Sequence, residues 1–166
     1  FDLVFIDGLH VYDQVKQDII NSLEVLNNNG VILIHDCLPE KIWEQNVPRM
    51  NGAWSGDVWK VIPFFRSKSN IDVYTCVADR GIGIIFKRPN KSILKLDQDT
   101  KKLKFKDYYN NYKSYMNLIS SEELEKGNKE FNINFNESES DVSVNTNYQT
   151  EKRDYSRWTP HNTLQK

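Results

Sequence analysis

The feature that most constrains the fold of this chain is a pattern in its first 36 residues: an apolar strand, an amphipathic helix and a second apolar strand. Residues 1–7 and 31–34 are rich in Val, Ile, Leu and Phe, which is typical of strands covered on both faces in a parallel sheet. Residues 12–26 carry apolar side chains at helical spacing, and Gly30 suits the turn that follows. The pattern predicts an open α/β sheet in which a helical crossover joins two parallel strands.

Polar side chains end both predicted strands: Asp7 ends the first, and the pair His35-Asp36 ends the second. If the strands are neighbours they lie about 4.8 Å apart, so Asp7 and Asp36 meet at the carboxyl edge, where open α/β sheets bind ligands. A shared hard cation, Mg²⁺ or Mn²⁺, would relieve the repulsion between the two carboxylates. His35 is a candidate third ligand, provided that the strand ends before it. The simpler alternative is that Asp7 only caps the following helix.

Further residues are candidates for a role at this edge. His10 follows Asp7 by three residues and is a candidate general base, because an unperturbed imidazole titrates near neutral pH; the alternative is a surface or capping histidine. Cys37 is either a nucleophile or a small loop residue, and nothing in the sequence indicates activation. Asp57 is a candidate substrate contact or a first-turn helix acid, and Trp54 is a sugar-facing ring or a packing residue.

The middle of the chain predicts a second set of elements. Residues 37–55 are expected to form a long loop, followed by a helix that Pro63 should kink or end. Residues 71–77 and 81–86 predict two strands, and their short connection makes them an antiparallel hairpin.

These elements predict three regions. Residues 1–90 form part of the α/β domain, and residues 91–126 add an aromatic amphipathic helix whose apolar side chains run from Phe105 to Ile119. Residues 127–166 are polar and rich in Asn and Ser, so we expect them to be disordered. Because an apolar strand already begins at residue 1, without an initiator Met, we expect the chain to be a fragment of a longer protein.

Composition argues against several classes of partner. Lys and Arg total 22 and Asp and Glu total 23, so the net charge of −1 does not predict binding to nucleic acid or to an anionic membrane. No apolar run approaches the roughly 18 residues that cross a bilayer. Two cysteines do not make a disulfide framework, so a reducing, cytoplasmic location is expected. The oligomeric state stays open.

Several blocks of the sequence resemble class I S-adenosylmethionine-dependent methyltransferases, in particular the group that modifies sugars and other small molecules. Residues 1–12 (FDLVFIDGLHVY) are similar to the fourth strand and its loop, with an Ile-Asp-Gly-x-His-x-Tyr signature. Residues 26–36 (LNNNGVILIHD) look like the next block of that family, and residues 56–60 and the hairpin are also similar to members of the group. The resemblance covers roughly residues 1–88.

The resemblance implies a Rossmann-like sheet of which this chain holds the last four strands, with the final pair antiparallel and helices on both faces. It implies methyl transfer from S-adenosylmethionine to a hydroxyl of a sugar or small metabolite. In related metal-dependent O-methyltransferases, acids at these strand ends hold a divalent cation and a basic residue deprotonates the acceptor. The matching positions are Asp7, Asp36 and His10, and Asp7 and Gly8 also border the cofactor. Some of those enzymes carry lysine where this chain has His10.

Two other functions stay open. A metal-dependent phosphotransfer domain also places Asp at strand ends, but it needs a lysine and a Ser or Thr at later strand ends, and the hairpin offers Thr75 without a lysine. A degenerate, non-catalytic interaction module would fit a chain that lacks the glycine-rich cofactor loop of the family. A strand and a Gly-x-Gly loop encoded upstream would favour the methyltransferase.

We predict that the isolated chain binds S-adenosylmethionine weakly or not at all. In the family, a glycine-rich loop after the first strand and an acid ending the second supply most cofactor contacts, and this sequence contains neither. Isothermal titration of the chain with S-adenosylmethionine checks this expectation, and a micromolar dissociation constant would contradict it.

Overall fold

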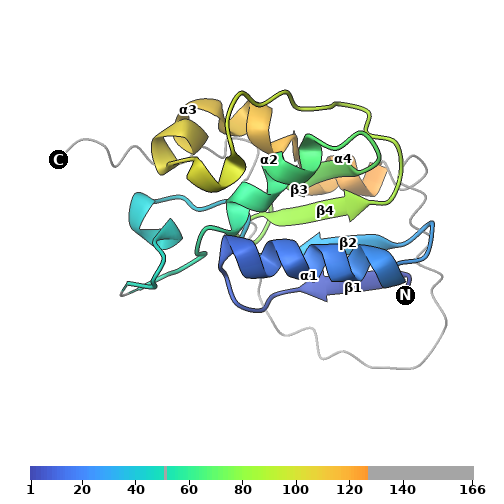
Figure 1. Ribbon diagram of the computed structural model, residues 1–166, viewed down its shortest axis with the longest axis horizontal. Coiled ribbons are helices and arrows are strands. Elements are labelled where there is room, and N and C mark those ends of the chain that lie inside the picture. The colour runs from blue at the N-terminus through green and yellow to red at the C-terminus, as the bar shows by residue number, and fades with distance from the viewer. Residues whose placement is uncertain (51, 127–166) are drawn as a thin grey trace.

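A five-stranded mixed sheet organises the chain, in the order β1-β2-β4-β3-β5 (Figure 1). The computed structural model describes residues 1–50 and 52–126. The strands are β1 (Leu3–Ile6), β2 (Val31–Ile34), β3 (Asp72–Cys76), β4 (Ile82–Phe86) and β5 (Leu118–Ile119). The α-helices are α1 (Tyr12–Val25), α2 (Val61–Arg66), α3 (Phe105–Met116) and α4 (Ser121–Lys126). Short 3₁₀ turns are η1 (Ile42–Gln45), η2 (Val58–Lys60) and η3 (Thr100–Lys102).

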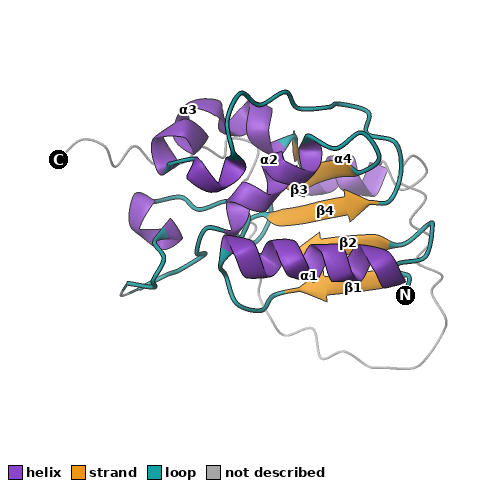
Figure 2. Cartoon of the chain, in the orientation of Figure 1, coloured by secondary structure: helices purple, strands orange, loops and turns teal. Residues whose placement is uncertain are grey.

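The first three elements form the predicted strand–helix–strand unit. β1 and β2 pair in parallel, in register from Leu3 with Val31 to Ile6 with Ile34. The helix between them, α1, lies along β1 and β2 (Figure 2) and buries the side chains of its inner face, Tyr12, Val15 and Ile19. The prediction that the two strands are parallel neighbours is therefore confirmed.

The positions of β3 and β4 determine which segments lie at the edge of the sheet where β1 and β2 end. β4 inserts between β2 and β3 and is antiparallel to both, which confirms the predicted hairpin. β1, β2 and β3 therefore run in one direction, and their carboxyl ends lie at the same edge as the β3–β4 turn. The short strand β5 pairs in parallel with β3 and adds a fifth strand to the four that the sequence predicted.

The predicted helix ending at Ile119 is wrong in its last turn. α3 ends at Met116 because Asn117 adopts a left-handed conformation (φ 49°) and donates a side-chain hydrogen bond to the carbonyl of Val73 (2.9 Å). The chain then turns along β3, and Ile119 pairs with Cys76.

Pro63 does not end the helix that contains it. α2 begins at Val61, so Pro63 lies in the first turn, where its missing N–H would have no intrahelical partner. The helix continues to Arg66.

The main core lies between one face of the sheet and the helices α1, α2 and α3. Residues from 91–126 share this core with the first ninety; they are Leu103, Phe105, Tyr108 and Met116. On the opposite face, Val31, Cys76, Ile84 and Phe86 form a second cluster, against which Leu124 of α4 packs. Helices therefore contact both faces of the sheet.

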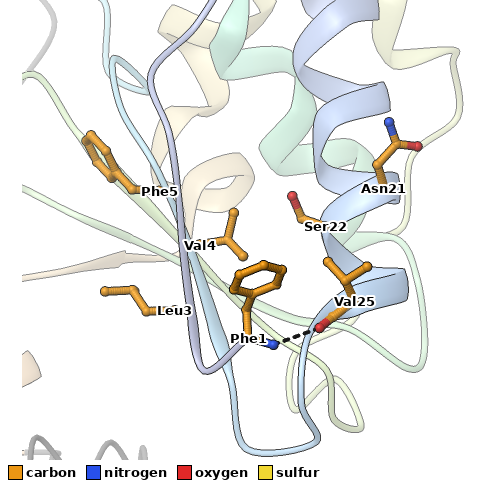
Figure 3. A pocket seen from close by; sticks show the side chains of 7 residues that line it. All are labelled: Phe1, Leu3, Val4, Phe5, Asn21, Ser22 and Val25. Atoms are coloured by element: carbon orange, nitrogen blue, oxygen red, sulfur yellow. Dashed lines mark hydrogen bonds between the residues drawn. The ribbon is translucent and has the colours of Figure 1, made fainter.

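One face of β1 is open, so the prediction that this strand is covered on both sides is wrong. Leu3 and Phe5 are 49% and 56% exposed. Figure 3 shows both side chains pointing away from α1, whereas Val4 points toward the helix and packs against the main core. A groove of about 520 Å³ beside β1 is lined by Phe1, Leu3, Val4, Phe5, Asn21, Ser22 and Val25.

Two other expectations concern the ends of the fold. Within residues 1–50 and 52–126, no helix combines the length and the apolar character that a membrane span needs. The region 127–166, predicted to be disordered, lies outside the described residues.

We predict that Trp59→Ala lowers the free energy of unfolding by roughly 3–5 kcal/mol, because the side chain is fully buried and packs on the ring of Tyr108 at 4.9 Å. Trp43 is 41% exposed and provides the matched control, since Trp43→Ala should change stability by about 0.5 kcal/mol or less. Urea unfolding measures both, and equal losses would contradict the assignment of Trp59 to the core.

Candidate functional site

Three side chains gather where β1 and β2 end. One ligand atom each from Asp7, His10 and Asp36 lies within 4.8 Å of the others. His10 stands between the two acids, with Nε2 3.1 Å from Asp7 Oδ1 and Nδ1 3.1 Å from Asp36 Oδ2. The side chain of Asp36 is 6% exposed and that of Asp7 is 44% exposed, so the cluster is buried on one side and open on the other. The predicted meeting of the two strand-end acids is confirmed.

His35 joins this cluster because the strand ends before it. β2 stops at Ile34, and Asp36 takes a left-handed conformation (φ 59°), so that neighbouring side chains no longer alternate between faces. His35 Nδ1 lies 3.4 Å from Asp7 Oδ1 and 3.6 Å from Asp36 Oδ2. The condition on which the sequence made His35 a candidate ligand is therefore met.

Within the part of the chain that the structure describes, the polar atoms of the cluster are not all satisfied by hydrogen bonds. His10 Nε2 forms a hydrogen bond with Asp7 Oδ1, but the buried Nδ1 atom of His10 makes none despite its 3.1 Å separation from Asp36 Oδ2. His35 Nε2 contacts Asp79 Oδ2 at 3.1 Å, which leaves Nδ1 toward Asp7 and Asp36. Carboxylate oxygens and imidazole nitrogens that converge in this way form a donor set that fits a divalent cation such as Mn²⁺ or Mg²⁺.

The loop between β2 and α2 holds His10 in place. Gly56 has φ +59°, and a Cβ built on it would lie 1.6 Å from the carbonyl oxygen of His10, so the two backbones touch. The ring of Trp54 stacks on the His10 imidazole, with centroids 5.4 Å apart and an interplanar angle of 26°. His10 is thereby fixed by contacts from a segment far from it in the sequence.

Of the other predicted site residues, Asp57 and Trp54 make defined contacts and Gly8 is exposed. The two oxygens of Asp57 accept from the N–H of Tyr12 (2.7 Å) and from Lys60 Nζ (3.2 Å), so this carboxylate holds the start of α1. Trp54 contacts His10, as stated, and donates Nε1–H to the carbonyl of Asn46 (2.7 Å). Gly8 is exposed, and a Cβ there would meet open space.

The candidate nucleophile Cys37 and the strand-end hydroxyl of Thr75 are both buried. Cys37 is fully buried, and burial raises the pKa of its thiol, so the reactive thiolate is suppressed. Its Sγ lies 3.4 Å from the carbonyl of Ile34. Thr75, the hydroxyl considered for phosphotransfer, is also fully buried within β3.

The sequence missed a layer of polar residues behind Asp36. Arg80, Ser55 and Glu44 contact one another there, with Arg80 Nε 2.8 Å from Asp36 Oδ1. In the sequence, Arg80 lies in the short connection of the predicted hairpin. The signal that could have found it is topological: β3 runs in the same direction as β2, so the β3–β4 turn lies at the edge where β2 ends.

Comparison with known proteins found one similarity, at the start of the chain. Residues 1–37 match the model of a methyltransferase domain family, Methyltransf_24. The match supports a methyltransferase domain. No curated protein and no solved structure matched the chain significantly. The matched segment contains the four residues of the cluster: Asp7, His10, His35 and Asp36.

We predict that Gly56→Ala destabilises the chain by more than about 1 kcal/mol, because alanine is strained at φ +59° and its Cβ would overlap the His10 carbonyl. The histidine ring signals of His10 should shift in the NMR spectrum as the backbone moves. Gly8→Ala is the control for stability, since no atom of the described residues lies within 4 Å of a Cβ built there. Unfolding curves that move equally for the two variants would contradict the contact.

Proposed function

We propose that this chain forms the catalytic edge of an S-adenosylmethionine-dependent O-methyltransferase that uses a divalent cation. The observation that carries the proposal is the convergence of Asp7, His10, His35 and Asp36 at the carboxyl edge, within the segment that matches a methyltransferase domain. A hydroxyl of a sugar or another small metabolite is the proposed acceptor.

Asp7, Asp36 and His35 are the proposed metal ligands. The two carboxylates offer Oδ1 and Oδ2 respectively, and the contact of His35 Nε2 with Asp79 favours the tautomer whose Nδ1 lone pair faces those oxygens. Like charges on the two acids repel, and a cation among them removes that cost.

His10 is the proposed general base. Its Nε2 lies 3.1 Å from Asp7 Oδ1 and its Nδ1 lies 3.1 Å from Asp36 Oδ2, so the imidazole stands beside both acids, next to the place proposed for the acceptor hydroxyl. The stacked ring of Trp54 covers one face of the imidazole and limits access of water there. When bound, S-adenosylmethionine supplies an electrophilic methyl group and the cation polarises the acceptor hydroxyl.

The residues of the chain then contribute by positioning and by proton transfer. Asp7 and Asp36 fix the cation site on two paired strands, so the distance between them is set by the sheet. His10 lies next to both acids and is therefore within reach of a hydroxyl held at that site. Methyl transfer is a single displacement, and accurate placement with removal of one proton is the catalysis that these groups can provide.

We predict that substitutions of the two histidines differ in their effect on Mn²⁺ affinity. His35→Gln should weaken Mn²⁺ binding at least tenfold, as should Asp36→Asn, because each removes a ligand, whereas His10→Gln should retain binding within about threefold. Isothermal titration of the chain with Mn²⁺ measures the affinities. Asp18→Asn, at a half-buried acid of α1 outside the cluster, is the control and should bind as the unmodified chain does.

The activity test uses the full-length gene product. EDTA should abolish methyl transfer and Mg²⁺ or Mn²⁺ should restore it, while His10→Gln should remain inactive with metal present. If metal binding persists in His35→Gln but is lost in His10→Gln, then His10 is the metal ligand and His35 is the candidate base. Methyl transfer that persists in the presence of EDTA would contradict the proposed requirement for a divalent cation.

A further inference from the structure

Arg80, in the turn between β3 and β4, contacts the carboxylate oxygen of Asp36 that does not face His10 and His35. Its Nε donates to Asp36 Oδ1 (2.8 Å), and its Nη2 donates to Ser55 Oγ (2.8 Å) and lies 3.5 Å from Glu44 Oε2. The side chains of Asp36 and Glu44 are only 6% and 5% exposed. One guanidinium thus supplies positive charge to two buried carboxylates, which would otherwise be costly to leave uncompensated.

The two oxygens of Asp36 therefore face different groups. Oδ1 is taken by Arg80, while Oδ2 faces His10 Nδ1 at 3.1 Å and His35 Nδ1 at 3.6 Å. The terminal torsion of an aspartate has a broad energy profile, so the carboxylate alone would not hold this orientation. A short, charge-assisted hydrogen bond at Oδ1 sets where Oδ2 points.

The turn that carries Arg80 is itself tied to the segment after Asp36. The carbonyl of Arg80 accepts from the N–H of Leu38 (2.8 Å), and the carbonyl of Gly81 accepts from the N–H of Cys37 (2.9 Å). The backbone of the turn and the backbone that follows Asp36 are therefore held together independently of the side chains.

Asp79, which precedes Arg80 in the turn, contacts His35, the residue before Asp36. Asp79 Oδ2 lies 3.1 Å from His35 Nε2. Adjacent residues of the turn therefore place a carboxylate against His35 and a guanidinium against Asp36. Asp79 is 78% exposed, whereas Arg80 is 33% exposed and faces buried carboxylates. Arg80 is the better-defined contact of the two.

We propose that Arg80 is a positioning residue that aims Asp36 Oδ2 at the cation. The inference rests on the proposed metal site. Arginine suits the task because its planar fork can hold Asp36 and Ser55 at once, whereas lysine offers the same charge as a single point. Arg80 does not contact the acceptor or the reacting atoms in this role.

The test compares Arg80→Lys with Arg88→Lys. Arg88 is a matched control because it also binds a buried aspartate, with Nε and Nη2 2.9 and 2.8 Å from Asp72 Oδ2, but it follows the opposite end of β4. Arg80→Lys should weaken Mn²⁺ binding roughly ten- to a hundredfold, the range for groups that orient metal ligands, and Arg88→Lys should leave it within about twofold. Isothermal titration and the Mn²⁺ electron paramagnetic resonance spectrum both measure this.

Each outcome decides the proposal. Selective loss in Arg80→Lys supports it; equal affinities of the unmodified chain and Arg80→Lys overturn it and leave the metal site standing. Equal losses in both variants show a general effect of stability and overturn it as well. If the unmodified chain does not bind Mn²⁺, the proposed metal site fails, and the positioning role fails with it.

A second measurement does not require Arg80→Lys to fold. In the chain labelled with ¹⁵N-arginine, the Nε–H signal of Arg80 should move on addition of Mg²⁺ while that of Arg88 stays in place. Asp36→Asn should abolish the response and shift the starting signal, whereas Asp18→Asn should change neither. An Arg80 signal that is indifferent to both Mg²⁺ and Asp36→Asn would overturn the inference.

Discussion

Parallel pairing of β1 with β2 is the contact on which the site depends. The register places Ile6 beside Ile34, and the N–H of His35 continues the ladder by donating to the carbonyl of Ile6 (3.0 Å). Asp7 and His35 therefore leave the sheet side by side, and the left-handed residue Asp36 turns the chain back toward them. Backbone hydrogen bonds, and not the polar side chains themselves, bring the charged groups together.

The sequence predicted this part of the molecule because the information is local. Helical spacing between two short apolar runs is enough to propose a strand–helix–strand unit, and parallel strands must end at one edge. The meeting of Asp7 and Asp36 follows from that rule alone. The hairpin was also predictable, since the connection between β3 and β4 is too short for any other arrangement.

The remaining features depend on contacts between distant segments, which a pattern along the chain does not contain. Asp57 holds the N–H of Tyr12, 45 residues earlier, and Arg80 reaches Asp36 across 44 residues. Asn117 ends α3 in a left-handed turn where the apolar spacing alone would continue the helix to Ile119. Apolar composition likewise predicted a strand covered on both faces, although Phe5 has an open side in this chain.

The backbone at the carboxyl edge has a consequence for how this protein can change. Asp36, Asp79 and Arg80 all have positive φ, at 59°, 38° and 61°, a conformation that costs an ordinary residue roughly 1–2 kcal/mol and glycine nothing. Glycine would relieve that backbone cost but would remove the carboxylates and the guanidinium, and loss of Arg80 would leave Asp36 and Glu44 buried without their cation. At this edge, therefore, the left-handed backbone and the charged contacts constrain the same three residues, so a substitution that relieves the backbone cost loses the contacts.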